Sequence, residues 1–448
     1  MNSRPDDHAA KTAAKAVWAP LRRRTSVAER ALLIGLLLVT LGTLTSRVDL
    51  VLLAIPLLIS TAIGADQRLR IGESSTVLVD LKRARSVGND RLFEYRVVVV
   101  APSDAEFVHL RIVPEIGDAK DLVLSPHVGA SFAGEHIIRH SGRQQIAKVS
   151  YRLIGADGAW ISEPSAPVVA ERSVAPAVHS LKEIASPFRL IGLAGARASA
   201  RPGDGGEFRD LHHYAPGDRL RRIDWKATAR RSHGFGDLLV RRTDATADAT
   251  VILVLDSRDD ICERVEGWSG AFLGHGGLDA MDLAREAAAS LAVAAVGAGD
   301  RVGFIDVAAQ NGVLSPAGGK RHLDRVLRCI AMVTPSGVRF SQRRAPIVPR
   351  GAIIYLMSTF FDLEVVELAR LWRAAGHRVI AVDVLPILDM QHCSLQTRTA
   401  QRILLAERRQ HLAAVHANGG ECFRWQDNAD RTSRAIALRT LARAGRRR

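Results

Sequence analysis

The stretch from His212 to Arg230, HHYAPGDRLRRIDWKATAR, combines histidine, aspartate, arginine, tyrosine and tryptophan within a short length of chain. His212, His213 and Asp218 could act as general acids and bases, because imidazole and carboxyl groups often transfer protons in catalysis. Such chemistry also needs a nucleophile or another reacting group, and no recognisable motif ties one to these three residues. We therefore predict no catalytic residue here and no enzymatic activity for this chain.

Arginine is the second chemical feature of this stretch, because guanidinium groups bind carboxylates and phosphates. Specific binding to nucleic acid is not expected, since nearby aspartates dilute the positive charge and aromatic residues make up only 5% of the chain. We predict a docking element for a protein partner, and a purely structural role is the alternative. The predicted interaction residues are Tyr214, Pro216, Gly217, Asp218, Arg221, Arg222, Asp224, Trp225 and Arg230.

Local signals indicate how this stretch folds. Pro216-Gly217 suits the two central positions of a type II turn, and Asp218 can then cap a helix. Trp225 is interpreted as a buried anchor, and the stretch is expected to pack on the outside of the sheet that follows it. A buried helix face is predicted from apolar residues at helical spacing, namely Leu220, Ile223 and Ala227.

The second half of the chain alternates between apolar strands and helices, which predicts a doubly wound, mostly parallel α/β sheet over residues 207–448. Functional groups in such sheets gather at the carboxyl ends of the strands, where Asp256 of LDSRDDICE is placed. This segment is not a glycine-rich phosphate loop, so no nucleotide or other cofactor is expected. Strands are predicted at 249–257, 301–308, 351–359, 377–385 and 421–425, and helices at 278–299, 320–333, 362–376 and 398–419.

Several motifs resemble those of domain of unknown function 58, a family of membrane-anchored, von Willebrand factor A-like proteins often paired with MoxR AAA+ ATPases. The resemblance covers residues 207–385 and implies an A-like domain over 207–448 with an N-terminal YxPGDxxRxIDW motif. It also implies a MoxR-type ATPase as partner. His212 stands where the family usually has an arginine. The motifs are EFRDLHHYAPGDRLRRIDWKATARRSHGFGDLLVRR, VILVLDS, DRVGFID, GGKRHLDRVLRCI and IIYLMSTFFD.

The resemblance also implies a position for a possible Mg²⁺ site, because many A-type domains bind the ion through D-x-S-x-S after the first strand. Asp256 matches the first aspartate, but Arg258 and Asp260 stand where the two serines belong. Thr359 replaces a later aspartate, and Asp362 lies three residues on. We predict a degenerate site at Asp256 and Asp260 that binds no metal, with the Arg258 guanidinium paired to Asp256 in place of a cation.

Two apolar segments, 31–45 and 50–65, predict a transmembrane helical hairpin over residues 31–65. A single long helix would place Arg47 and Asp49 in mid-membrane, where charges are costly. Basic residues flank both outer ends, so the positive-inside rule predicts two spans in the cell membrane with the soluble domains in the cytoplasm. A buried hairpin in a soluble core is the alternative. Residues 1–30 are expected to form a basic N-terminal segment.

Residues 74–174 show the period-two pattern of strands, with about seven strands over about 100 residues. This pattern predicts an immunoglobulin-like β-sandwich without a disulfide. Residues 175–206 are small and rich in glycine, and they are expected to form a linker. The four cysteines are widely spaced, which favours reduced thiols over a zinc site.

These features together predict a membrane-anchored, cytoplasm-facing adaptor or scaffold that acts with a MoxR-type ATPase and has no catalysis of its own. The predicted partners are that ATPase and the lipid bilayer, without a small-molecule substrate. The formal net charge of +15 leaves other functions open. These are a basic membrane protein that binds nucleic acid or anionic lipid, and an A domain that binds protein through a divalent cation.

Overall fold

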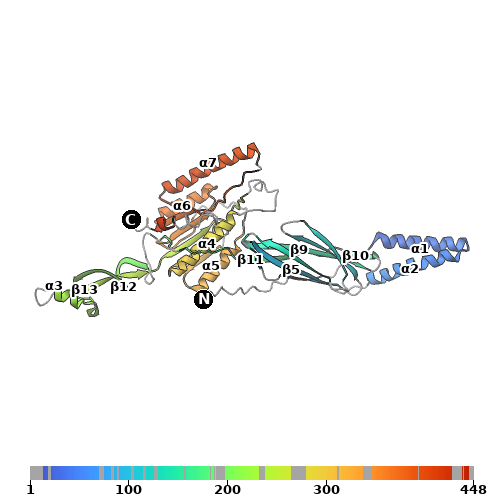
Figure 1. Cartoon of the computed structure of the whole chain (residues 1–448), viewed down its shortest axis with the longest axis horizontal. Helices are drawn as coiled ribbons and strands as arrows, with labels where there is room; N and C mark the ends of the chain where they lie inside the picture. The colour runs from blue at the N-terminus through green and yellow to red at the C-terminus, as the bar shows by residue number, and fades with distance from the viewer. Residues whose placement is uncertain are drawn as a thin grey trace. The chain divides into compact units, whose positions relative to one another are not determined.

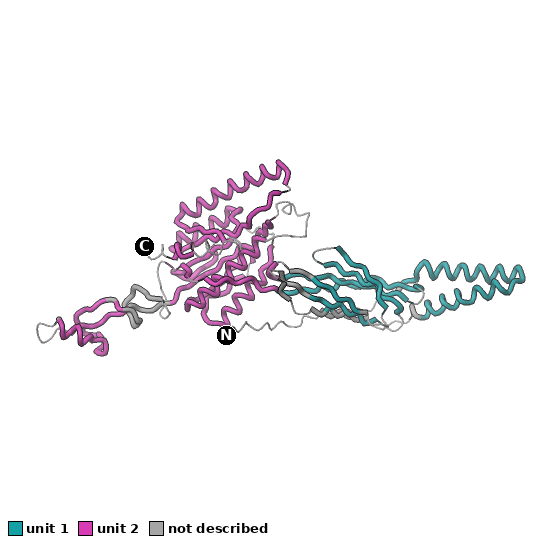
Figure 2. Tube along the Cα trace, viewed as in Figure 1, with its two compact units in different colours: residues 1–139, 143–173 teal, residues 140–142, 174–448 magenta. Residues whose placement is uncertain are grey.

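The chain divides into two units in this computed structural model (Figure 2). Unit 1 contains residues 1–139 and 143–173, and unit 2 contains residues 140–142 and 174–448. The structure describes residues 14–18, 22–69, 75–81, 85–87, 90–101, 105–114, 118–125, 130–138, 140–155, 158–181, 183–185, 187, 197–231, 238–263, 279–309, 312–336, 345–391, 393–425, 436 and 438–442.

Unit 1 begins its helical part with α1 (Ser26–Leu44) and α2 (Val48–Leu69), which lie side by side in Figure 1. Gly35 and Gly42 allow this close packing, because a Cβ atom at Gly42 would lie only 2.7 Å from a side-chain carbon of Val51. Both helices are long and apolar enough to cross a membrane by length and composition. Only 11% of each candidate span is buried in the structure, whereas a soluble core helix is mostly buried.

The remainder of unit 1 consists of two β-sheets, and the expected strand pattern of residues 74–174 is confirmed. Strands bury alternate residues, as Val108, Leu110 and Ile112 do in β6. The first sheet contains β1 (Ala14–Trp18), β3 (Ser75–Leu81), β4 (Arg85–Val87), β5 (Asp90–Val100) and β8 (Ala130–Ile138). The second contains β2 (Arg22–Arg24), β6 (Ala105–Pro114), β7 (Lys120–Leu124), β9 (Gly142–Gly155), β10 (Trp160–Ser162) and β11 (Val168–Val174).

The basic N-terminal segment contains two strands that the sequence analysis did not predict. Its β1 pairs with β3, and its β2 pairs with β10, each in antiparallel orientation. The segment therefore supplies one strand to each sheet before the chain enters α1. Residues 1–13 and 19–21 of the segment lie outside the described residues.

Unit 2 is built on a six-stranded sheet of order β16-β15-β14-β17-β18-β19. All neighbouring strands are parallel except β15 and β16, which are antiparallel. Numbered within this sheet the order reads 3-2-1-4-5-6, which is a doubly wound order. The strands are β14 (Thr250–Leu255), β15 (Arg301–Asp306), β16 (Val313–Ala317), β17 (Ile353–Ser358), β18 (Arg378–Asp383) and β19 (Glu421–Arg424).

Helices cover both faces of this sheet, as Figure 1 shows. Successive side chains of β14 point to opposite faces of the sheet. Leu253 therefore packs in one apolar core with α4 and α5, and Val254 packs in a second core with α6 and α7. The predicted doubly wound α/β arrangement is therefore confirmed. The helices are α4 (Ala280–Gly297), α5 (Lys320–Met332), α6 (Leu363–Ala374) and α7 (Leu395–Ala417).

The segment expected to be a linker, 175–206, is partly ordered within unit 2. Ile184 and Ala185 belong to the apolar core, and the Ala185 backbone N–H donates to the Tyr355 hydroxyl over 3.0 Å. Further along, β12 (Arg197–His213) begins within this segment and pairs with β13 (Leu239–Ala247) in a two-stranded antiparallel sheet. Residues 186 and 188–196 of the predicted linker lie outside the described residues.

Candidate functional site

Asp256 stands at the point of the six-stranded sheet where the strand order reverses. It follows β14 directly, and its backbone N–H donates to the carbonyl of Met357 in the neighbouring β17 over 3.0 Å. Ligand sites in open α/β sheets form at this position, outside the carboxyl ends of the strands. The sheet therefore puts Asp256 where the alternating pattern predicts functional groups.

Arg258 pairs with Asp256 through both carboxylate oxygens, and this predicted pair is confirmed. The Arg258 Nε donates to Asp256 Oδ1 over 2.8 Å, and its Nη2 donates to Oδ2 over 3.2 Å. The hydroxyl of Ser358 donates to Oδ2 over 2.7 Å. Only 2% of the Arg258 side chain is exposed, so this two-pronged contact is shielded from water.

Two further carboxylates surround the same guanidinium. Its Nη1 lies 3.1 Å from Asp362 Oδ2 and 2.7 Å from Glu364 Oε2. Burial alone would lower the pKa of Arg258, but the hydrogen bond and charge of Asp256, with the charges of Asp362 and Glu364, raise it instead. The guanidinium thus fills the position next to Asp256 that a metal ion would need. The absence of metal binding at Asp256 stays a prediction.

Two other strands of the sheet, β15 and β18, also end in an aspartate, and the sequence analysis did not identify these residues. Asp306 ends β15 and accepts a hydrogen bond from the Ser257 hydroxyl over 2.5 Å. Asp383 ends β18 and pairs with Arg408 of α7, whose Nε also donates to the Thr359 carbonyl over 2.6 Å. The sequence signal that could have identified them is an aspartate at or just after the end of each of three parallel strands. Each of these carboxylates is engaged by a neighbouring side chain.

Asp260 is not part of this strand-end cluster, which we define as Asp256, Arg258, Ser358, Asp362 and Glu364. Its Oδ1 accepts a hydrogen bond from the Met281 backbone N–H in the first turn of α4, over 3.1 Å. Burial raises the pKa of Asp260, and the charge of Asp282 raises it further. Asp260 thus contacts the start of α4, because the chain after Arg258 turns toward that helix. That the degenerate site at Asp256 and Asp260 binds no metal stays a prediction.

The predicted type II turn at Pro216-Gly217 is confirmed. The Asp218 N–H donates to the Ala215 carbonyl over 3.0 Å, and Gly217 has a φ of 108°, which glycine adopts at no steric cost. The Asp218 carboxylate accepts from the Ala215 N–H and pairs with His212 Nε2 over 2.9 Å. These two contacts, the Ala215 bond first, lower the pKa of Asp218. Asp218 therefore closes the turn and does not cap a helix, which corrects the prediction.

The helix expected after the turn is divided into a 3-10 turn, η3 (Leu220–Arg222), and a short helix, α3 (Trp225–Arg231). The break occurs because Ile223 is extended and forms a β-bridge to Val240 of β13. Asp224 then caps α3, with its Oδ1 accepting from the Ala227 N–H over 2.9 Å. The stretch was expected to pack on the sheet that follows it, and in the structure η3 and α3 contact β13 of the two-stranded sheet.

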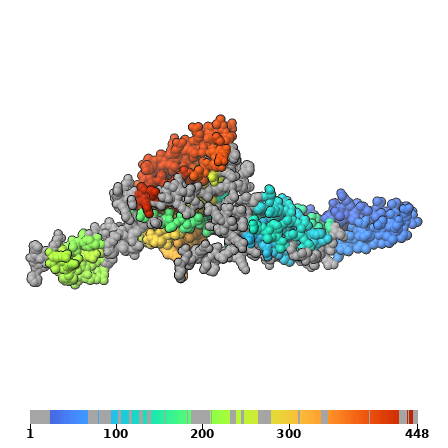
Figure 3. Space-filling view, viewed as in Figure 1, coloured from blue at the N-terminus to red at the C-terminus, as the bar shows by residue number. Residues whose placement is uncertain are grey.

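The break changes which side chains are buried. Ile223 is buried as predicted, and Ala227 is half-buried. Leu220 and Trp225 are each 66% exposed, so the predicted buried anchor at Trp225 is wrong. The extended residue between η3 and α3 interrupts the helical phase, and Trp225 consequently faces solvent. The segment around α3, light green in Figure 3, lies at the molecular surface.

An open hollow of about 510 Å³ lies beside Trp225. Among the described residues that line it are three arginines and one carboxylate, Asp224, whose Oδ1 already caps α3. The Arg241 guanidinium also lies over the Phe208 ring, 5.3 Å from its centroid. The lining residues are Arg221, Arg222, Ile223, Asp224, Trp225, Arg241 and Thr243. Of the other predicted interaction residues, Tyr214, Pro216 and Arg230 are exposed.

A match to a known protein family covers both this surface and the strand-end cluster. The model of the family described as "Protein of unknown function DUF58" matches residues 210–395. The match runs from within β12 to the first residue of α7, so it includes both the 212–230 stretch and Asp256. The resemblance inferred from the motifs is therefore confirmed.

The curated relatives that the chain resembles are uncharacterized mycobacterial proteins. One from Mycobacterium bovis and two from strains of Mycobacterium tuberculosis are each 30% identical over 214 residues. The match covers 44% of this chain and 61% of each relative, so the chain spans about three fifths of the length of these relatives. No solved structure matches the chain.

Proposed function

We propose that this DUF58 protein is a membrane-anchored adaptor whose docking surface is the hollow beside Trp225. The observation that carries this proposal is an exposed tryptophan set among Arg221, Arg222 and Arg241. Tryptophan and arginine dominate the binding energy of protein interfaces. The partner that suits this surface is an acidic protein with an apolar cavity for the indole ring.

Exposed apolar side chains near the hollow support a protein partner over a polymer of phosphates. Phe208 is 53% exposed, and Leu220 is as exposed as Trp225. A mixed apolar and basic surface matches the centre and rim of a protein interface. We propose a MoxR-type AAA+ ATPase as this partner, on the ground of the family resemblance.

The proposed role of the α/β domain is that of a scaffold with a von Willebrand factor A-like fold. The strand order and the antiparallel edge strand β16 support this assignment. Arg258 supplies a permanent positive charge at Asp256, so the domain would hold its strand-end structure without Mg²⁺. We further propose that the two sheets of unit 1 form an immunoglobulin-like sandwich.

We propose that α1 and α2 anchor the chain in the cell membrane, with both ends of the hairpin in the cytoplasm. Apolar side chains such as Leu33, Leu37 and Leu53 are exposed on these helices and need an apolar environment. Basic residues precede α1 and follow the apolar part of α2, as the positive-inside rule requires for cytoplasmic ends.

A reporter fusion tests this topology. A carboxyl-terminal fusion is expected to be active with a reporter that works in the cytoplasm and inactive with one that works only outside the membrane. A second fusion after Arg47, between the helices, is expected to show the opposite pattern. Activity of the external reporter at the carboxyl terminus would refute both the topology and the cytoplasmic partner.

Charge reversal in the hollow tests the docking proposal. Arg221→Glu and Arg241→Glu are each expected to weaken binding of the full chain, in mild detergent, to the purified MoxR-type ATPase of the source organism by at least about tenfold. The physical reason is that truncating or reversing one partner of a close charge pair costs about 2–5 kcal/mol. Calorimetry or surface capture would measure the affinity.

Arg325→Glu is the matched control, because Arg325 is an exposed arginine on α5 of the same unit. Its binding should stay within about twofold of the unmodified chain. Equal weakening by all three variants would mean that only net charge matters. Capture that is lost after nuclease treatment would indicate nucleic acid instead of a protein partner.

A further inference from the structure

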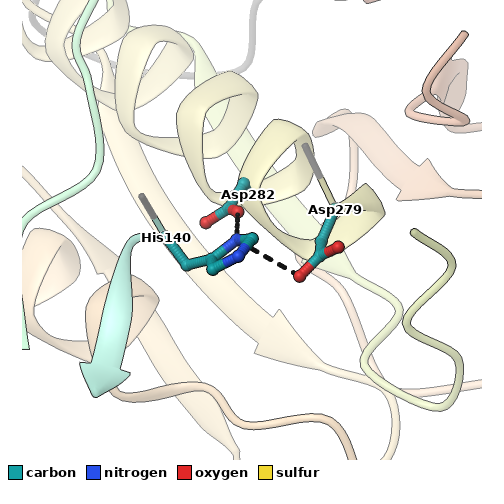
Figure 4. A group of neighbouring side chains, drawn as sticks. All are labelled: His140, Asp279 and Asp282. Atoms are coloured by element: carbon teal, nitrogen blue, oxygen red, sulfur yellow. Dashed lines mark hydrogen bonds and ion pairs between the residues drawn. The ribbon is translucent and has the colours of Figure 1, made fainter. Parts of the chain in front are cut away.

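Three side chains outside the strand-end cluster converge in unit 2, as Figure 4 shows. The Nδ1 atom of His140 lies 2.6 Å from Asp282 Oδ2 and 3.2 Å from Asp279 Oδ2. One ligand atom from each residue lies within 4.8 Å of the other two. The group therefore offers one imidazole nitrogen and two carboxylate oxygens to a common point.

The start of α4 places the two aspartates on one side of the helix. Asp279 is the residue before the helix, and Asp282 lies three residues later in its first turn, a spacing that brings side chains together. Ser141 orients Asp282, because its N–H and its hydroxyl donate to Oδ1 over 2.7 and 2.8 Å. These bonds leave Asp282 Oδ2 directed at His140.

One carboxylate oxygen of Asp279, Oδ1, lacks a hydrogen-bond partner among the described residues. Only 9% of the Asp279 side chain is exposed. A buried carboxylate oxygen without a partner is costly. An additional ligand at the cluster would relieve this cost.

The charges around the cluster also favour a cation. Asp260 brings a third carboxylate to this group, and Arg285 is a permanent cation whose charge acts on all three. The Arg285 Nη1 atom lies 3.6 Å from Asp282 Oδ1, and the guanidinium donates to the carbonyls of Ser141 and Val333 over 2.8 and 2.7 Å.

We propose that His140, Asp279 and Asp282 bind a divalent first-row transition-metal ion such as Zn²⁺. Imidazole together with carboxylates is a ligand set for such ions, whereas Mg²⁺ prefers oxygen ligands alone. Tetrahedral ligands at about 2.0–2.2 Å from zinc lie about 3.3–3.6 Å from each other. The 3.2 Å contact of His140 with Asp279 is close to that separation, and the 2.6 Å contact with Asp282 would lengthen as the ion replaced the proton between the two atoms. The two hydrogen bonds from Ser141 would hold the Asp282 carboxylate in the orientation that the ion needs.

Three protein ligands leave one position of a tetrahedral ion for water or another ligand. The ion would tie residues 140–142 to the start of α4 and would add its charge to that of Arg285 beside the three carboxylates. This site differs in residues and position from the strand-end cluster, where Arg258 already provides the cation.

Zinc titration of the full chain tests the proposal. The protein, purified in detergent without a polyhistidine tag and stripped with a chelator, is titrated with Zn²⁺ in a calorimeter. We expect one saturable site and a higher melting temperature with Zn²⁺ present, because a ligand that binds the folded state stabilises it. Asp279→Asn is expected to weaken this site at least about tenfold and to abolish the melting shift.

His109→Ala is the matched control, because His109 lies 3.4 Å from Asp121 in an exposed histidine–aspartate pair of unit 1. It should leave Zn²⁺ affinity unchanged. His140→Gln serves as a second variant if Asp279→Asn does not fold. Zinc affinity that survives either folded variant would overturn the proposal, as would Mg²⁺ binding as tight as that of Zn²⁺.

Discussion

Replacement of Arg258 by alanine is expected to lower the free energy of unfolding of unit 2 by about 3–5 kcal/mol, the usual cost of breaking a buried ion pair. The loss is large because Asp256 would keep its charge in a site that is closed to water, beside Asp362 and Glu364. Chemical denaturation of the full chain in detergent, followed by circular dichroism, would measure it.

Arg370→Ala is the matched control for this prediction. Arg370 makes an equally short contact, 2.8 Å to Glu367, but both side chains are about half exposed. Such surface pairs contribute about 0–1 kcal/mol. If Arg258→Ala cost no more than this control, the strand-end cluster would have to be open to solvent.

A double variant separates the charge from the packing at the same place. Arg258→Met combined with Asp256→Leu removes both charges and keeps apolar volume, and replacing a buried pair in this way is often neutral or stabilising. We expect it to be more stable than Arg258→Ala alone. An equally unstable double variant would show that the hydrogen bond from Ser358 and the shape of the site matter more than the paired charge.

Trp225→Ala is expected to weaken binding to the ATPase partner by at least about 30-fold, which corresponds to an interface hot spot of about 2 kcal/mol. The stability of the chain should change by no more than about 0.5 kcal/mol, because the exposed ring makes few internal contacts. Affinity and denaturation measured on the same preparation would distinguish the two effects.

Trp372→Ala is the control, because this variant is expected to lose stability. This tryptophan of α6 is 2% exposed, and its indole N–H donates to the Pro346 carbonyl over 3.1 Å. Its removal should cost about 3–5 kcal/mol of stability through lost burial and the cavity left behind. A Trp225→Ala variant that lost stability to the same extent would indicate a structural role for the 212–230 stretch, and the docking surface would have to lie elsewhere.

Periodicity along the chain was enough to predict five strands and four helices of unit 2 and the two apolar helices of unit 1. The five expected strands of the six-stranded sheet and its four helices occur where the pattern placed them, because burial on both faces of a parallel strand leaves an apolar run. The contact between Arg258 and Asp256 was also predictable, since the two residues lie two positions apart.

Other features depend on partners that are distant in the sequence. Strands β1 and β2 are recognised only through their pairing with β3 and β10, because short polar segments carry little periodic signal. The apolar spacing after Asp218 indicated one continuous helix, but pairing of Ile223 with Val240 divided it and turned Trp225 to solvent.

The type of each long element follows from the order of apolar and polar residues, because local burial periodicity reflects the geometry of helix and strand directly. Which charged groups meet depends on how these elements pack. This packing separated Asp260 from Asp256, and it brought His140 to Asp282 across 142 positions of the chain. Strand order and the docking of a loop on a helix set these contacts, and neither leaves a regular spacing in the sequence.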